Sequence, residues 1–222
     1  MGKHWSDTVW TVIDLETTGL DFETVHVVQL GVATLQRGKV LGIRSTLCNP
    51  GIPIPPEATA IHGITDEMVS DAPSELQVLR ELFFELLEAE CMVHYNGLGY
   101  DMQILEKILG KRAIFALRRV VPEVDVLTIV REKHVGKFWS GKGRHKLTTV
   151  AARFGISWVC AHNAGADCVM TGRVLWELIQ SNDWVRGLPG DIDVGLKLRR
   201  LARDQEEASQ RWVERQREDK PA

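Results

Sequence analysis

The chain has 222 residues, of which 44% are hydrophobic and 26% charged, a composition typical of a globular protein with one full hydrophobic core and an appendage. Its net charge of −3 argues against broad, nonspecific coating of nucleic acid, although a local basic rim around an acidic pocket is compatible with it. No apolar run approaches the roughly 18 residues that cross a membrane, and the N-terminus lacks the apolar core of a signal peptide. The cysteines show no CxxC spacing. We therefore expect a cytoplasmic protein with buried thiols.

The first half of the sequence predicts three strands in succession. A β-branched run over 8–14 is typical of a buried strand. Two further strands, over 25–35 and 39–47, are joined by a turn at 36–38, and we expect them to form a hairpin. The proline-rich residues 49–56 cannot continue a sheet, because proline lacks the N–H that a strand ladder needs.

Helices and strands then alternate along the chain. Ser74 and Gln77 form a capping box that predicts the start of a helix. Hairpin strands followed by alternating helices and strands indicate an α/β domain with a mixed sheet. The apolar face of the capped helix comprises Leu76, Leu79, Leu82, Phe83, Leu86 and Leu87. Beyond it, we expect strands over 91–95 and 120–126 and helices over 101–109, 147–154 and 166–179.

The C-terminal part of the sequence is more highly charged. We expect one folded domain over 1–183, a linker with glycines and a proline over 184–193, and a charged amphipathic helix or tail over 194–222. The stripe on this helix either folds back on the domain or binds a partner protein, and the sequence leaves both open. The stripe comprises Val194, Leu198, Leu201, Ala208 and Trp212, with Gln205 interrupting it.

Two acidic residues stand where the first strand runs into a Thr-Thr-Gly turn. Asp14 and Glu16 are two positions apart, so their side chains point to the same face of a strand. Adjacent like charges repel each other and resist desolvation, so a fold gains nothing from them unless a cation neutralises them. Carboxylate oxygens suit Mg²⁺ or Mn²⁺. The alternative is that both side chains are solvated on an edge strand and have no function.

Two later segments place further acidic residues at expected helix starts. Asp101 follows the strand at 91–95, and Asp167 opens the helix at 166–179, five residues after His162. An aspartate at a helix start is commonly only a cap or a favourable partner of the helix dipole. A lone histidine in a loop is more often a surface or packing residue than a base. Each segment alone therefore indicates little.

Together, the three segments resemble the three exonuclease motifs of the DEDDh family. This family includes the proofreading (epsilon) subunit of bacterial DNA polymerase III and, more distantly, RNase T and oligoribonuclease. The resemblance extends over roughly residues 8–180, with supporting stretches at 26–32, 56–65 and 146–147. The motifs read Asp14-x-Glu16-Thr17-Thr18-Gly19, Tyr95-Asn96-x-x-x-Tyr100-Asp101 and His162-x-x-x-x-Asp167.

The second motif departs from the pattern of the proofreading subunit, which often reads His-Asn-x-x-Phe-Asp. Here Asn96 stands five residues before Asp101, and Tyr100 replaces the phenylalanine. The aspartate itself is intact, so the departure concerns how the terminal nucleotide is held and not the chemistry.

The resemblance implies an RNase H-like fold with a five-stranded mixed sheet flanked by helices. It also implies a 3′–5′ exonuclease that releases 5′-mononucleotides with two divalent ions, Mg²⁺ or Mn²⁺. We expect Asp14 to bridge both ions, Glu16 and Asp167 to complete one site, and Asp101 to act through waters on the second. His162 is expected to take the proton from the attacking water.

Contacts to the substrate follow from the same resemblance. The alternatives are ordinary packing for Leu20 and Tyr100 and a loop hydrogen bond for His62. The basic segment 131–146 suits a rim that follows the phosphates of single-stranded ends, and its alternative is a solvated loop. The residues expected to contact the terminal nucleotide are Thr17, Thr18, Gly19, Leu20, Glu57, His62 and Tyr100.

Three functions are open at this point. The leading hypothesis is a 3′–5′ DNA exonuclease in proofreading or repair, with single-stranded DNA as the favoured substrate. An exoribonuclease on the same scaffold is its nearest rival, because nothing in the sequence reads the 2′-OH. The third is an interaction module that docks on a polymerase or another protein through its C-terminal helix, although the presence of all four carboxylates argues against a purely structural role.

Overall fold

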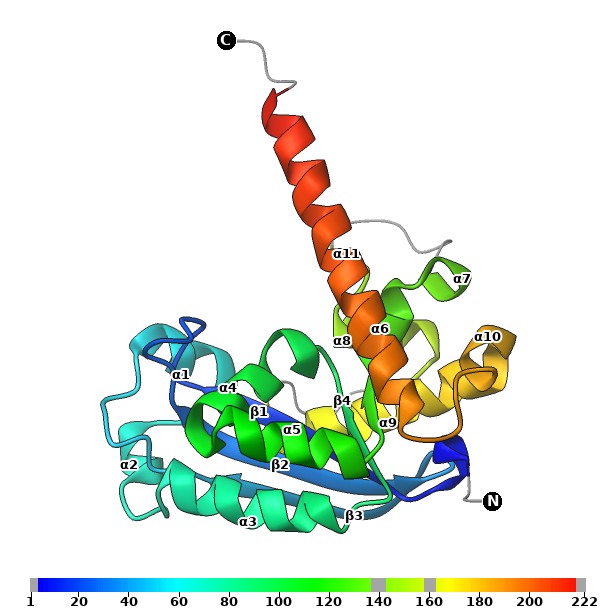
Figure 1. Ribbon diagram of the computed structural model, residues 1–222. Coiled ribbons are helices and arrows are strands. Elements are labelled where there is room, and N and C mark those ends of the chain that lie inside the picture. Colours follow the sequence, from blue (N-terminus) through cyan, green and yellow to red (C-terminus); the bar gives the residue numbers. More distant parts are fainter. Residues whose placement is uncertain (1–3, 137–142, 158–162, 219–222) are drawn as a thin grey trace.

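A computed structural model of the chain describes residues 4–136, 143–157 and 163–218. Its centre is a five-stranded mixed sheet with strand order β3-β2-β1-β4-β5 (Figure 1), as predicted. β2 is antiparallel to β1 and β3, whereas β4 runs parallel to β1 and β5. The strands span Trp10–Thr17 (β1), Val27–Gln36 (β2), Lys39–Leu47 (β3), Cys91–His94 (β4) and Glu123–Asp125 (β5).

Helices cover both faces of the sheet. On one face, Ile13 and Leu15 pack against α3, α4 and α5, which lie in front of the sheet in Figure 1. On the other face, Trp10 and Val12 pack against α6, α8, α9, α10 and the start of α11. The helices span Trp5–Asp7 (η1), Pro56–His62 (α1), Asp66–Val69 (α2), Glu75–Leu87 (α3), Gly97–Gly99 (η2), Asp101–Leu109 (α4), Lys111–Val120 (α5), Val126–Arg131 (α6), Lys133–Gly136 (α7), Leu147–Arg153 (α8), Ala164–Ser181 (α9), Asp183–Arg186 (α10) and Asp193–Glu218 (α11).

The helix predicted from the capping box is confirmed as α3. The Gln77 N–H donates a hydrogen bond to Ser74 Oγ at 3.3 Å. The buried face of α3 differs from the prediction, because Leu76 and Leu87 are exposed. The buried residues are Val78, Leu79, Leu82 and Leu86, which recur at the helical period on the side that faces the sheet.

The strand predicted over 120–126 is wrong at both ends. Only β5 pairs with β4, because α5 precedes it and α6 follows it. The Thr128 N–H donates to Asp125 Oδ1 at 3.0 Å, so Asp125 caps α6 and stops the strand. The sequence analysis did not identify α5, whose apolar side is buried through Ile114 and Leu117.

Residues 184–193, which the sequence predicts to be a linker, lie against the domain. They include most of α10, and Val185 and Leu188 are buried in the core cluster that covers one face of the sheet. Val194 and Leu198 bury the first turns of α11 in the same cluster. The rest of α11 extends away from the sheet (Figure 1). The division into domain, linker and helix stays a prediction.

The first described residues are joined to the segment that precedes α11. The Trp5 N–H donates to the Gly190 carbonyl at 3.0 Å, and His4 Nε2 donates to the Leu188 carbonyl at 3.1 Å. The Trp5 side chain is buried beside Trp10, with ring centroids 6.3 Å apart. The two ends of the domain therefore meet at one place.

The cysteines that the structure describes behave as predicted. Cys48, Cys91 and Cys168 are free and buried, and burial raises the pKa of the Cys48 thiol to about 12. Cys160 lies outside the described residues. Across the described ranges, no helix has both the length and the hydropathy that a membrane crossing requires.

The first turn of α9 approaches the sheet closely at Gly31. This glycine pairs with Asp14 in the β1–β2 ladder. A β-carbon at Gly31 would lie 2.2 Å from the backbone carbon of Ala164 and 2.5 Å from the backbone nitrogen of Gly165. The missing side chain thus allows the helix backbone to lie over the strand directly beside Asp14.

Gly31→Ala is expected to lower the free energy of unfolding by about 1–3 kcal/mol, because the new methyl group would displace helix backbone instead of a flexible side chain. Urea denaturation measures the change. Gly42→Ala in β3 is the matched control, since its β-carbon would meet only the side chain of Thr34, at 3.1 Å. Equal losses for both variants would contradict the role of the close approach.

Candidate active site at the end of the first strand

Asp14 and Glu16 lie in the second half of β1. They share a strand face with Trp10 and Val12, which pack beneath α9, so both carboxylates are directed toward that helix. The parallel pairing of β1 with β4 ends at Val12 and Val93. The carboxylates therefore follow the last paired residues, at the carboxyl end of β1, where binding sites of α/β sheets are commonly found.

Two hydrogen bonds fix the start of α9. The Ala164 N–H donates to Gln29 Oε1 on β2 at 3.0 Å, and the Ala166 N–H donates to Asn163 Oδ1 at 3.2 Å. They hold the helix so that Asp167 falls in its first turn. The sequence analysis did not recognise this role of Gln29. Its signal is a polar residue in an otherwise apolar strand.

The structure brings three of the predicted metal ligands together. One carboxylate oxygen from each of Asp14, Glu16 and Asp167 lies within 4.8 Å of the others. All three side chains are partly buried. Such a group of hard oxygen donors can hold a divalent cation.

Asp101, the fourth predicted carboxylate, approaches β1 from α4. It is 4% exposed, and its Oδ1 accepts a hydrogen bond from the Leu15 N–H at 3.1 Å. Because Leu15 stands between Asp14 and Glu16, this bond brings Asp101 to the same section of the strand. Asp101 is not part of the group of three whose oxygens lie within 4.8 Å.

Burial and repulsion between neighbouring carboxylates raise the pKa values of Asp14, Glu16 and Asp101. Burial, reinforced by the charges of Asp167 and Asp101, raises the pKa of Glu16 to about 7. Burial raises the pKa of Asp101 to about 6. The pKa of Asp14 is raised well above its ordinary value by burial and then by Asp101, Asp167 and Glu16. A bound cation would favour the ionised forms and so offset these shifts.

A buried charged group that the sequence analysis missed lies close to Asp101. His94, the last residue of β4, lies 3.4 Å from both Glu123 and Asp125. Burial lowers the pKa of His94, but hydrogen bonds to Asp125 and Glu123 outweigh it and raise the pKa to about 10. The resulting positive charge acts against the effect of burial on the pKa of Asp101.

The turn that follows Glu16 is held by Tyr100. Its hydroxyl donates to the Gly19 carbonyl at 2.5 Å and lies 2.6 Å from Thr17 Oγ1. The ring of Tyr100 packs against Phe22, with ring centroids 5.7 Å apart. Leu20 is 80% exposed, so it is not an ordinary packing residue. The sequence analysis missed Phe22, because a single aromatic residue in a loop carries no periodic signal.

The other predicted substrate contacts lie in different surroundings. Thr18 fastens the turn to His26 by two hydrogen bonds, Thr18 N–H to the His26 carbonyl at 2.9 Å and His26 N–H to Thr18 Oγ1 at 3.0 Å. Glu57 is exposed in the first turn of α1. His62 Nδ1 accepts the Ile64 N–H at 3.0 Å, the loop hydrogen bond weighed as its alternative. Their contact with a nucleotide stays a prediction.

A cavity of about 730 Å³ opens beside Asp167 and is lined in part by basic residues. The predicted base, His162, and residues 137–142 of the basic segment lie outside the described residues. The basic side chains that line this cavity are Arg131, Arg144, His145 and Lys146.

The model of the family described as "Exonuclease" matches residues 11–175. The chain therefore belongs to this exonuclease family. The matched range contains all four carboxylates and His162, and it ends before α10 and α11.

Known relatives and structures are consistent with this membership. A DNA polymerase III of PolC type from Lacticaseibacillus paracasei is 29% identical over 169 residues, which cover 76% of this chain and 11% of the relative. The chain thus spans about a tenth of the length of the curated relatives that it matches.

Two solved structures share the predicted fold. E. coli exonuclease I in complex with a dT13 oligonucleotide superposes with a TM-score of 0.67 and 19% identity, covering 78% of this chain and 41% of the other. Exonuclease X in complex with 5′-overhanging duplex DNA has a TM-score of 0.58 and 23% identity, covering 82% of this chain and 98% of the other. These likenesses confirm the RNase H-like exonuclease fold.

In the presence of EDTA, raising the pH from about 4.5 to about 7 is expected to lower the free energy of unfolding. The pKa of Glu16 is about 7 and that of Asp101 about 6 in the folded state, so the folded chain binds more protons than the unfolded chain in this window. Stability present at low pH is then lost as these groups ionise. Urea denaturation at about pH 5, 6 and 7 measures the slope.

Mg²⁺ is expected to reduce this decline, because a cation compensates the ionised cluster. Asp14→Asn removes one of the interacting charges and is expected to make the decline in EDTA shallower. Identical slopes in EDTA and Mg²⁺ would contradict a metal site at these carboxylates.

Proposed function

We propose that the protein is a 3′–5′ exonuclease that removes 5′-mononucleotides from the 3′ end of single-stranded DNA, in proofreading or repair. The observation that carries this proposal is the group formed by Asp14, Glu16 and Asp167 at the end of β1, with Asp101 bonded to the same strand. Membership of the exonuclease family supports the reaction. The dT13 complex of exonuclease I supports single-stranded DNA as the substrate.

The donor set fits two divalent metal ions. All four side chains offer the hard carboxylate oxygens that Mg²⁺ and Mn²⁺ prefer. The raised pKa values of Asp14, Glu16 and Asp101 reflect burial and repulsion that a cation would offset. We infer that Asp14, Glu16 and Asp167 would hold one ion and that Asp14 and Asp101 would contribute to holding the second. When bound, the ions would lower the pKa of the attacking water and stabilise charge on the departing 3′ oxygen.

The chain's own residues would position the terminal nucleotide. The backbone from Thr17 to Gly19 forms a turn held by Tyr100, which suits contact with the terminal sugar and phosphate. Leu20 and Phe22 present apolar surface next to this turn, on which a base can pack. Glu57 and His62 belong to the same proposal as further contacts, and His162 is the proposed proton acceptor by its place in the third motif.

The polymerase relatives support a polymerase as the partner in this proposal. The part of α11 that extends from the domain is the proposed contact surface (Figure 1). A cytoplasmic location, expected from the sequence and consistent with free, buried cysteines, belongs to the same proposal.

Asp14→Asn is expected to reduce nuclease activity by more than about a hundredfold, because a carboxylate that would hold the ions is lost. The assay uses single-stranded DNA labelled at its 5′ end, with RNA of the same sequence beside it, in Mg²⁺ and in EDTA. Wild-type protein should give a ladder of single-nucleotide steps on DNA in Mg²⁺ only.

Glu81→Gln, at an exposed position of α3, is the matched control and should keep full activity. A ladder on RNA alone would keep the catalytic assignments and replace DNA by RNA as the substrate. Normal activity of Asp14→Asn would refute the proposed site.

Tyr100→Phe is expected to raise KM several-fold while kcat changes little, because the hydroxyl orders the turn at Gly19 and does not take part in the chemistry. The free energy of unfolding should fall by no more than about 1.5 kcal/mol, the usual contribution of one hydrogen bond. Steady-state kinetics on single-stranded DNA separate the two constants. A large fall in kcat at unchanged KM would give Tyr100 a different role.

A further inference from the structure

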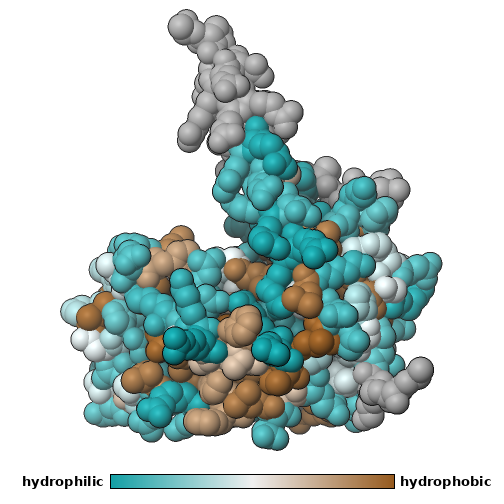
Figure 2. All heavy atoms as spheres, viewed as in Figure 1, coloured by the Kyte–Doolittle hydropathy of each residue, from teal (hydrophilic) through white to brown (hydrophobic). Residues whose placement is uncertain are grey.

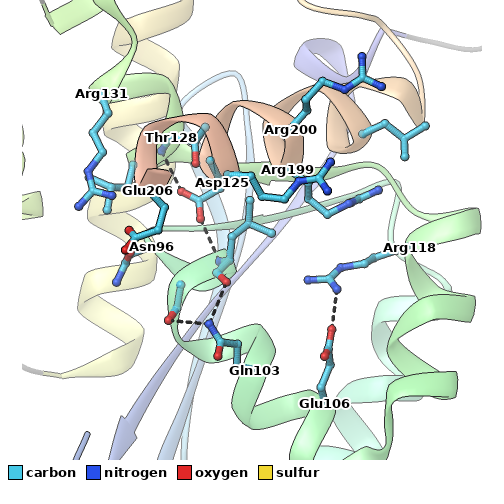
Figure 3. Close-up of a pocket in the computed structure, with 16 residues that line it drawn as sticks. Asn96, Gln103, Glu106, Arg118, Asp125, Thr128, Arg131, Arg199, Arg200 and Glu206 are labelled. Carbon is cyan, nitrogen blue, oxygen red and sulfur yellow. Dashed lines mark hydrogen bonds and ion pairs between the residues drawn. The ribbon is translucent and has the colours of Figure 1, made fainter. Parts of the chain in front are cut away.

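A groove of about 920 Å³ runs between α11 and the segment that links β4 to α4 (Figure 3). We call it the α11 groove. Figure 3 shows α11 on one side and Gln103 and Glu106 of α4 on the other. Five arginines and three carboxylates line it, namely Arg118, Arg131, Arg199, Arg200 and Arg203 against Glu106, Asp125 and Glu206.

Most of the acidic charge in the groove is already paired. Glu106 forms an ion pair with Arg118 at 2.7 Å, and Asp125 accepts the backbone N–H groups of Leu98 and Thr128. Glu206 is the remaining carboxylate, and it accepts a hydrogen bond from Gln210 at 3.2 Å.

Much of the basic charge, in contrast, is available. Among the described residues, Arg131, Arg200 and Arg203 form no ion pair, and all three are exposed. Figure 2 shows the hydrophilic surface of α11 above the domain. Three arginines without an ion pair against one such carboxylate, Glu206, leave the groove with a net positive charge.

The wall that α11 provides is firmly attached to the domain. Arg199 forms an ion pair with the buried Glu123, which also pairs with Arg118 at 3.0 Å. Further along the helix, Gln205 Nε2 donates to the Thr128 carbonyl at 3.1 Å. Gln205, which interrupts the apolar stripe, is thus a contact to α6. The groove is therefore preformed over the turns that carry Arg200 and Arg203.

The α11 groove continues into the cavity beside the carboxylates. Asn96, Leu127 and Arg131 line both the groove and the cavity of about 730 Å³ that Asp167 borders. A chain of basic positions therefore leads from the predicted active site to the turns of α11 that carry Arg200 and Arg203. This path includes a helix that the family match does not cover.

We propose that the α11 groove binds the phosphate backbone of a single nucleic-acid strand, 5′ to the nucleotide held at the carboxylates. The proposal rests on the proposed function of that site and extends it. Arginine is suited to this role, because its planar guanidinium donates paired hydrogen bonds to phosphate oxygens. The helix would thus add phosphate contacts to long strands, and a short substrate would not reach these contacts.

The test is made in an Asp14→Asn background, so that the strand is not degraded. It compares the protein with and without the double substitution Arg200→Glu/Arg203→Glu. Binding of fluorescein-labelled single-stranded DNA is measured by anisotropy at several salt concentrations. For a strand of about 20 nucleotides, Kd should rise at least about tenfold, and the slope of log K against log salt should shrink by about 1.4, or 0.7 for each of two phosphate contacts.

The loss is expected to depend on strand length. A dinucleotide reaches only the carboxylates, so its hydrolysis by the active enzyme should show a far smaller effect than degradation of the long strand. Lys39→Glu/Arg80→Glu is the matched control. It makes the same change in net charge at exposed positions on β3, the opposite edge of the sheet, and on α3. This control should bind like wild type.

Equal weakening by both double variants, or a loss that is the same for long and short strands, would overturn the proposal. Unchanged binding of the Arg200→Glu/Arg203→Glu variant would overturn it as well. Both positions are exposed, so the substitutions should leave the fold intact, and Arg200→Gln/Arg203→Gln provides a milder variant with an intermediate loss. The anisotropy comparison is made without turnover, so its outcome is independent of whether the proposed nuclease activity is found.

Discussion

The packing of the first turn of α9 onto β2 is the constraint on which the rest of the site depends. Gly31 faces Asp14 across the β1–β2 ladder, and helix backbone fills the space that a side chain would take. This approach carries Asp167 to the carboxylates of β1. The same packing holds like charges together under partial burial, and the raised pKa of Glu16 is the sign of that electrostatic cost. The domain therefore contains a locally unfavourable cluster that a cation can relieve.

The sequence predicts those parts of the fold and site whose signals are local. The hairpin, α3, α4 and α9 have clear periodicity, and the four carboxylates stand in motifs defined by the chemistry they serve. β5 was predicted too long, because Val120 and Val126, which also suit a strand, belong to α5 and α6. The burial of Glu123 and Asp125 depends on His94, some thirty residues away. Gln29 acts on a helix that begins far along the chain. Such roles depend on tertiary contacts, which a local pattern does not contain.

The first half of α11 belongs to the domain in energetic terms, although the family match ends before it. Its apolar residues complete the core beside α9, and Arg199 joins Arg118 and His94 in neutralising the buried Glu123. The ion pair and the apolar contacts act at neighbouring turns of one helix. The direction of α11 is therefore set by the domain, and Arg200 and Arg203 are presented at a fixed place relative to the carboxylates.

The hydrogen bonds between residues 4–5 and 188–190 affect the order in which parts of the molecule can fold. β1 is the central strand of the sheet and the first of the five strands in the sequence. The residues just before it, His4 and Trp5, form hydrogen bonds with Leu188 and Gly190 near the other end of the domain. Contacts between residues so far apart in sequence form late and slowly compared with those inside a hairpin or a helix. A chain emerging from the ribosome could form the β2–β3 hairpin early. Its carboxylate cluster would be assembled only after α9 and the residues up to Leu198 had been synthesised.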